Sequence, residues 1–174
     1  MVLNREEIEK LIKEGKLIEN YIDLEKQLTP NGFDLTVNKI FSFKDAGALD
    51  FSNKERELSK AQEVRFFRKS SQDKYGWWRL KKGAYKIVTN EVFNLPHNLI
   101  ALSFPRSSLL RMGAFTQTGV WDAGFKGKSE FILVVENLRG IRIKQNARIV
   151  QLIFLRINKV REGYKGIYNL NSKP

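Results

Sequence analysis

Short runs of β-branched and aromatic residues, separated by Gly, Pro and Asn, fill most of this 174-residue chain and restrict its fold more than any other feature. Such runs are typical of β-strands, and the residues between them are typical of turns. The expected strands span 33–43, 63–68, two segments within 77–89, 99–104, 131–135, 141–143 and 149–157. Because 131–135 is nearly all apolar, we expect that strand to be buried on both faces. The pattern predicts an all-β barrel or sandwich.

A helical pattern precedes the strands. Residues 4–14 have apolar side chains at helical spacing, and Asn4 is suited to cap a helix that Gly15 can end. We therefore expect one short N-terminal helix that packs on the β-structure.

Composition excludes several kinds of site. Cysteine is absent, which excludes disulfides, thiolate metal sites and cysteine nucleophiles. His97 is the only histidine, so we expect it on a surface turn and expect neither a histidine-rich metal site nor a Ser-His-Asp triad. No apolar run approaches the roughly 18 residues of a membrane span, and the N-terminal segment lacks a signal-peptide core. We expect one cytoplasmic domain over 1–174 with no membrane association.

The chain is strongly basic. It contains 31 Lys and Arg against 19 Asp and Glu, a net charge of +12. This excess attracts polyanions such as nucleic acid, anionic lipid or a free nucleotide. A charge-rich surface that forms ion-pair networks is the alternative, and charge alone does not choose between them.

The segment 106–127, RSSLLRMGAFTQTGVWDAGFKG, concentrates groups suited to phosphate chemistry. Ser107 or Ser108 can cap a short helix whose first N–H groups receive a phosphate, and Arg106 and Arg111 can bind its oxygens. Asp122 lies among glycines, where a carboxylate can orient water or help hold a metal. A capped surface helix followed by an Asx turn is the alternative interpretation.

Taken together, these motifs resemble a known family. The run 80–127, the later ARIVQLIF at 147–154 and NGFDL at 31–35 resemble the dCTP deaminase / dUTP diphosphatase superfamily, most closely its archaeal-type dUTPase subfamily. The resemblance implies a distorted β-barrel with a short helix after the R-S-S motif. It also implies a homotrimer with active sites at subunit interfaces, and a deoxynucleoside triphosphate substrate with Mg²⁺ held mainly by the substrate phosphates. No direct protein ligand is assigned to this ion.

The resemblance also implies roles for individual residues. Asp122 matches the motif aspartate that lies under the sugar and, in the diphosphatases, holds the attacking water. The phosphate-binding positions are Arg106, Ser107, Ser108, Arg111 and Gln151; the base- and sugar-binding positions are Thr118, Gly119 and Phe125; the tail positions are Tyr164, Lys165 and Tyr168. The polar tail, 161–174, is expected to be mobile and to close over the active site.

The reaction depends on a glutamate. Deamination of cytosine at C4 needs a general acid/base beside the ring, which similar deaminases place ten residues after the motif aspartate. That position is Ile132 here, and aligning on Asn137 instead gives Val134. Glu130 and Glu136 share the strand face of Ile132, so a shifted register, or a two-residue insertion before the strand, would bring Glu130 into the site.

The tail also departs from the deaminase pattern, since Ile167 and Asn171 replace a lysine and a glutamine. We therefore expect hydrolysis of dUTP to dUMP and pyrophosphate. A dCTP deaminase, alone or bifunctional, is the alternative, and a non-catalytic binder of nucleotide or nucleic acid is the third possibility. Nucleic acid is not expected as a partner.

Overall fold

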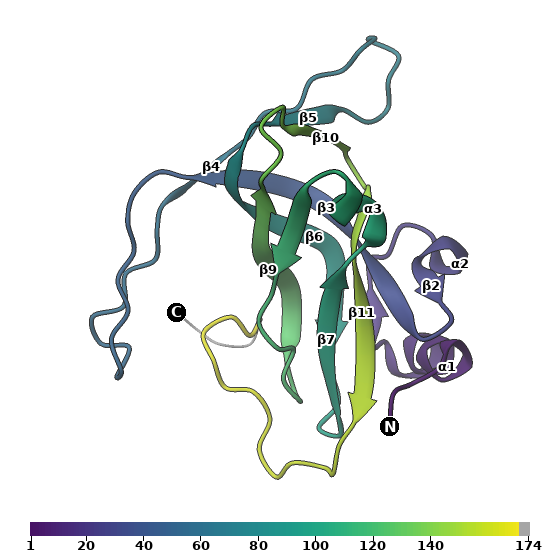
Figure 1. Cartoon of the computed structure of the whole chain (residues 1–174). Coiled ribbons are helices and arrows are strands. Elements are labelled where there is room, and N and C mark those ends of the chain that lie inside the picture. Colours follow the sequence, from purple (N-terminus) through teal and green to yellow (C-terminus); the bar gives the residue numbers. More distant parts are fainter. Residues whose placement is uncertain (171–174) are drawn as a thin grey trace.

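The computed structural model describes residues 1–170 and consists mainly of β-strands (Figure 1). The helices are α1 (Arg5–Gly15), α2 (Leu24–Gln27) and α3 (Ser107–Arg111). The strands are β1 (Ile18–Glu19), β2 (Leu28–Thr29), β3 (Gly32–Phe43), β4 (Ala61–Glu63), β5 (Trp77–Leu80), β6 (Gly83–Asn94), β7 (Leu99–Pro105), β8 (Ala114–Gln117), β9 (Lys126–Val135), β10 (Ile141–Lys144) and β11 (Arg148–Arg156).

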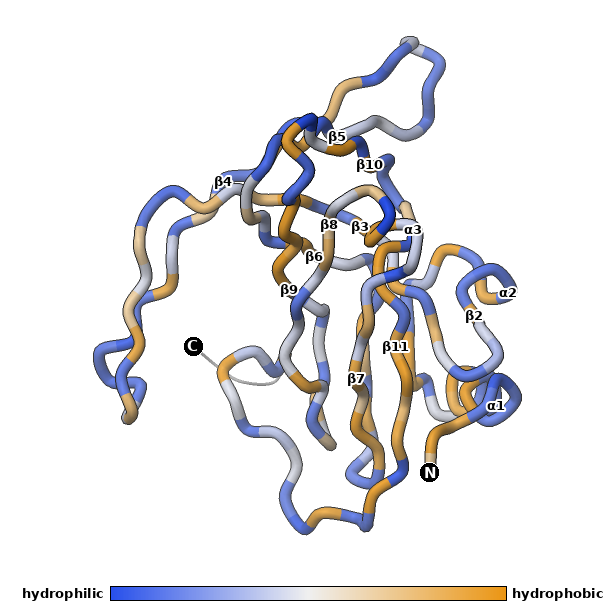
Figure 2. Tube along the Cα trace, viewed as in Figure 1, coloured by the Kyte–Doolittle hydropathy of each residue, from blue (hydrophilic) through white to orange (hydrophobic). Residues whose placement is uncertain are grey.

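The main sheet curls into a nearly closed barrel, which confirms the predicted distorted β-barrel. Its strand order is β7-β11-β3-β6-β9-β8, and all of these pairings are antiparallel. The two ends of this order meet beyond β8, where Ala101 and Trp121 exchange two backbone hydrogen bonds of 3.0 Å. Inward side chains from every long strand fill the barrel, and β11 is coloured mostly as hydrophobic in Figure 2.

The N-terminal helix forms as the sequence predicts. Asn4 and Glu7 make a reciprocal capping box, and Ile8 and Ile12 are buried against the barrel. The helix ends at Gly15, but the left-handed residue that terminates it is Lys16, with φ of 51°. Gly15 therefore does not supply the positive φ expected of a helix-terminating glycine.

Two strand predictions are wrong in detail. Of the expected strand at 63–68, only Glu63 belongs to a strand, as the last residue of β4, because the chain leaves the main sheet there and Phe66 packs edge-on against Trp78 instead of extending the ladder. The strand β9 is not buried on both faces: its side chains alternate, and Ile132 is half-buried beside a cavity. The short elements β1, α2 and β2 were not expected from the sequence.

Two segments extend away from the barrel. Residues 44–60 form a long arm between β3 and β4, held near its middle by paired backbone bonds between Ala48 and Glu57 (Figure 1). The strands β5 and β10 pair with each other and form a small ribbon beside the barrel, and Trp77 of β5 also exchanges backbone hydrogen bonds with Phe67. No helix in residues 1–170 is long and apolar enough to cross a membrane.

Candidate active site

A buried carboxylate organises two arginines at one end of β11. Asp34 lies on β3 with a side chain that is 2% exposed, and Oδ2 is 3.0 Å from Arg106 Nε and 3.3 Å from Arg148 Nη1. Burial raises the pKa of Asp34, and the two guanidinium groups offset part of this effect. Neither carboxylate oxygen of Asp34 accepts a well-aligned hydrogen bond within 1–170, so these contacts are ionic. Asp34 therefore fixes Arg106 and Arg148 at one place.

Gln151 belongs to the same group of residues. It is the cross-strand partner of Asp34 in the β11–β3 pairing, and its Nε2 donates to Thr29 Oγ1 at 2.7 Å. A Cβ on Gly32 would lie 2.1 Å from the Leu152 carbonyl oxygen, so only glycine lets β3 approach β11 this closely. The structure thus brings the predicted phosphate-binding residues Arg106 and Gln151 together.

The other phosphate-binding candidates face solvent on α3. Ser107, Ser108 and Arg111 are exposed. The expected serine cap is wrong: the N-cap residue is Arg106, and no side chain caps this helix. Because Ser107 and Ser108 both lie within the helix, their hydroxyl groups remain available to a ligand.

Asp122 opens a tight turn after the segment that closes the barrel. Its backbone carbonyl accepts a hydrogen bond from Phe125 N at 3.0 Å, while its side chain is exposed and makes no hydrogen bond or ion pair within 1–170. The Asx-turn alternative, in which the carboxylate binds turn amides, is therefore not observed. Gly124 completes the turn with φ of 83°, which favours glycine.

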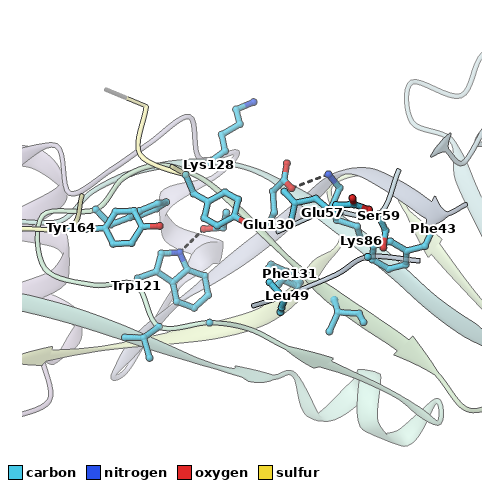
Figure 3. A pocket seen from close by; sticks show the side chains of 18 of the residues that line it. Phe43, Leu49, Glu57, Ser59, Lys86, Trp121, Lys128, Glu130, Phe131 and Tyr164 are labelled. Carbon is cyan, nitrogen blue, oxygen red and sulfur yellow. Dashed lines mark hydrogen bonds and ion pairs between the residues drawn. The ribbon is translucent and has the colours of Figure 1, made fainter. Parts of the chain in front are cut away.

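The predicted base- and sugar-binding residues lie at or near a cavity of about 900 Å³. Figure 3 shows side chains that line this cavity. Gly119 and Phe125 line it, whereas Thr118 lies next to it and accepts a hydrogen bond from Ser103 Oγ at 3.1 Å. The walls come from β9, the 44–60 arm and the C-terminal tail. Trp121 forms part of the wall, and its indole Nε1 donates to Ser129 Oγ at 2.6 Å. Six of the twenty lining residues are aromatic, and charged and polar side chains are interspersed among them.

Glu130 and Ile132 both line this cavity, as their shared strand face predicts. The Glu130 carboxylate, however, lies 2.9 Å from Lys86 Nζ, and a dashed line marks this ion pair in Figure 3. This glutamate is about half exposed and its charge is neutralised by a neighbour. Glu136 lies outside the cavity lining and pairs with Lys82 at 2.7 Å.

The tail returns along the barrel and covers part of the cavity. Tyr164 stacks edge-on against Phe125 with ring centroids 5.6 Å apart, and its backbone N–H donates to the Ala123 carbonyl at 2.8 Å. Burial raises the pKa of the Tyr164 hydroxyl. Tyr168 also lines the cavity, whereas Lys165 is exposed and pairs with Glu162.

The rest of the tail bears on two further predictions. The His97 ring is half-buried, and two glycines lie against it: Gly124, in the turn after Asp122, and Gly163, near the start of the tail. The expected surface turn around His97 is therefore partly covered. Asn171, one of the two tail positions that differ from the deaminase pattern, lies outside the described residues.

No group of three or more His, Asp or Glu residues in 1–170 is arranged to hold a metal ion. A magnesium ion that reaches this surface with a nucleotide needs few protein ligands, because Mg²⁺ keeps several waters and binds substrate phosphates. The exposed, unpaired carboxylate of Asp122 is an oxygen ligand of the type that Mg²⁺ accepts. The residues present therefore fit such an ion.

The sequence did not single out three charged residues of this site. Asp34 stood out only as part of a motif, and Arg148 and Lys86 did not stand out at all. An aspartate inside the strand-like run 33–37 (FDLTV) was a usable signal, because a buried charge requires a partner. Nothing in the sequence indicated which cations would supply it.

Comparisons with known proteins agree with this geometry. The dCTP deaminase-like family model matches residues 2–157. A protein of Methanosarcina mazei named probable deoxyuridine 5'-triphosphate nucleotidohydrolase is 47% identical over 169 residues, covering 96% of this chain and 95% of that protein. Its namesake in Archaeoglobus fulgidus is 44% identical, covering 96% and 95%. The deoxyuridine 5'-triphosphate nucleotidohydrolase of Methanocaldococcus jannaschii is 37% identical, covering 83% and 88%.

Among solved structures, a 2'-deoxycytidine 5'-triphosphate deaminase from Agrobacterium tumefaciens superposes with a TM-score of 0.65 at 22% identity, covering 90% of this chain and 48% of that one. This likeness supports the fold. Because the family model spans most of the sequence and the relatives align over nearly its full length, the chain belongs to the dCTP deaminase-like family.

Proposed function

We propose that this protein hydrolyses dUTP to dUMP and pyrophosphate. In this reaction, a water oxygen bonds to the α-phosphorus, the bond from that phosphorus to the bridging oxygen breaks, and pyrophosphate leaves. The relatives named for this activity, at 44–47% identity over almost the whole chain, support the substrate and the reaction. A cytoplasmic location, where free nucleotides are found, fits this role.

The observation that carries the proposal is the free carboxylate of Asp122. A group that orients water for in-line attack must be ionised and must not be occupied by another residue. Asp122 is exposed and unpaired within 1–170, and its charge is a minor cause, after burial, of the raised pKa of Tyr164, which lines the cavity. We assign Asp122 to hold the attacking water.

The remaining residues bind the two ends of the nucleotide. Phe125 and Gly119 offer a ring and a bare backbone to the sugar and base, while Arg106 and Gln151 supply donors for phosphate oxygens. Ser107, Ser108 and Arg111 add donors from α3. When bound, Mg²⁺ would neutralise charge on the departing pyrophosphate. Tyr164 and Tyr168 would exclude water from the sugar side.

We further propose that the active enzyme is a homotrimer with sites between subunits. Within one chain, none of the α3 residues that would bind phosphate lines the described cavity. Exposed apolar side chains surround that helix, namely Phe104, Leu110, Met112 and Phe115, and the arm carries Leu49, Phe51 and Leu58. Apolar surface of this extent beside polar binding residues is typical of a subunit interface.

The deaminase alternative depends on Glu130. Proton transfer at C4 of cytosine favours a carboxyl group that is desolvated and not occupied by another charge. Glu130 lines the cavity but is about half exposed and paired with Lys86, and Ile132 beside it cannot transfer protons. Hydrolysis is therefore the better-supported reaction.

The two reactions are separated by incubating the protein with Mg²⁺ and either dUTP or dCTP, then measuring pyrophosphate and ammonia. We expect pyrophosphate from dUTP and no ammonia from dCTP. Asp122→Asn should lower kcat at least 100-fold, with folding checked by circular dichroism. Ammonia from dCTP that disappears in Glu130→Gln would instead establish deamination.

A further inference from the structure

Most of the excess positive charge of this protein lies outside the proposed active site. Residues 64–82 and 139–144 contain ten Lys and Arg and a single acid, Asp73, a net charge of +9 out of +12 for the whole chain. These 25 residues form β5, β10 and the segments that flank them. Figure 2 shows long hydrophilic stretches at this end of the molecule. Composition alone does not place this charge, but the fold does.

The ribbon presents its cations on one face. In the β10–β5 pairing, Arg142 lies opposite Arg79 and Lys144 lies opposite Trp77, while the alternate residues of both strands are buried against the barrel. Like charges directly opposite each other destabilise a β-ribbon. Neither arginine has an acidic partner within residues 1–170. The arrangement is therefore unfavourable for the protein alone, and a bound anion would relieve it.

Aromatic rings are interleaved with these cations. Lys69 Nζ and Lys144 Nζ lie 5.3 and 5.5 Å from the centroid of the Trp77 ring, and Arg142 Cζ lies at 6.0 Å. On the neighbouring segment, Arg79 Cζ is 4.7 Å from the Phe67 ring centroid. The single acid, Asp73, accepts hydrogen bonds from the backbone N–H groups of its own loop, so its charge is turned toward the loop.

We propose that the outer face of this ribbon, formed by Arg79, Arg142, Lys144, Trp77 and Lys69, binds single-stranded nucleic acid. Clustered cations bind the phosphate backbone, and aromatic rings among them stack on bases. A membrane surface is less well matched, because no large apolar side chain within 64–82 or 139–144 is among the strongly exposed ones. The face shares no residue with the proposed hydrolytic site, so the two proposals are tested separately.

The test measures fluorescence anisotropy of a labelled oligo-dT of about 20 nucleotides, longer than the sites of comparable single-strand binders. The protein is titrated at several salt concentrations. The patch variant is Arg79→Ala with Arg142→Ala and Lys144→Ala. A matched control, Lys10→Ala with Lys54→Ala and Lys159→Ala, removes the same charge from exposed sites elsewhere.

We expect the patch variant to bind oligo-dT at least tenfold more weakly and to lower the salt slope by about 2, since each lost phosphate contact contributes about 0.7. The control should change affinity less than about threefold. Trp77→Ala should weaken binding about fivefold or more through lost stacking. Hydrolysis of dUTP should be unchanged in all variants, which shows that they fold.

Equal losses in the patch and control variants would overturn the proposal, because binding would then follow net charge alone. Absence of oligo-dT binding at low salt would also overturn it. Tighter binding to vesicles of anionic phospholipid than to oligo-dT, abolished in the patch variant, would assign the face to a membrane surface instead.

Discussion

Replacing Asp34 with asparagine should separate stability from function. Asn keeps the size of the side chain but removes the buried charge that holds Arg106 and Arg148. At about 3 Å and an effective dielectric constant of about 20, each ion pair attracts by roughly 5 kcal/mol. The effective cost of burying an ion is several kcal/mol for each charge, and Asp34 is almost completely buried. Attraction and desolvation are therefore of similar size.

The direction of the Asp34 pKa shows which effect is larger. Its pKa is raised, with burial as the largest cause, so the folded protein binds a proton at Asp34 more tightly than the unfolded chain does. The ionised form therefore costs stability at neutral pH. Arg106 and Arg148 remain about one-third exposed and can be hydrated when the carboxylate is gone. We expect Asp34→Asn to be as stable as wild type or up to about 1 kcal/mol more stable at pH 7.

Urea unfolding measures this difference, and a thermal melt should shift upward by no more than about 2–4 °C. Any advantage of the variant should shrink as pH falls through the folded-state pKa of Asp34, because wild type then becomes neutral as well. Substrate binding should weaken even though stability does not fall, because Arg106 is no longer held in place. KM for dUTP should rise about threefold to tenfold, which corresponds to part of the free energy of one hydrogen bond to a charged group. Glu6→Gln, which removes one exposed carboxylate elsewhere, is the kinetic control. A loss of more than 2 kcal/mol, or an unchanged KM, would refute this reasoning.

Two further predictions concern the buried Glu91 and the partly buried Tyr164. Glu91 is fully buried, and its carboxylate accepts hydrogen bonds from Gln27 Nε2 at 2.8 Å, from Thr36 Oγ1 at 2.6 Å and from Thr36 N. Glu91→Gln would turn an amide N–H₂ group toward these donors. The variant should therefore lose about 1–3 kcal/mol of the free energy of unfolding, measured with urea. Because burial raises the pKa of Glu91, wild type gains stability relative to this variant as pH falls through the folded-state pKa of Glu91. The gap should therefore widen, and a gap that narrows would contradict the assignment. Tyr164→Ala should lose the edge-on contact with Phe125, lower the free energy of unfolding by about 0.5–1.5 kcal/mol and raise KM for dUTP. Tyr164→Phe keeps the ring and should therefore keep the wild-type stability and KM. Equal effects in the two variants would show that the ring contact is not responsible.

Local sequence patterns predicted the structure correctly where interactions between residues near each other in the chain determine it. The capping box of α1 needs only Asn4 and Glu7 three residues apart, and the sequence indicated Asn4 as the cap. Alternation along β9 placed Glu130 and Ile132 on one face, and both do line the cavity. The prediction for 63–68 failed because Phe66 packs on Trp78, a partner that local periodicity does not specify.

The sequence by itself determined the strand-rich class, the motifs and the family that they resemble, because these depend on residue type and spacing along the chain. Only the tertiary structure decided which polar groups meet. Asp34, Arg106 and Arg148 come from separate segments and converge because β3 and β7 both pair with β11. Lys86 meets Glu130 because β6 pairs with β9, and Arg79 faces Arg142 because β5 pairs with β10. Periodicity determines which face of a strand is buried, but strand order and register determine its neighbours, and the charges of this protein depend on those neighbours.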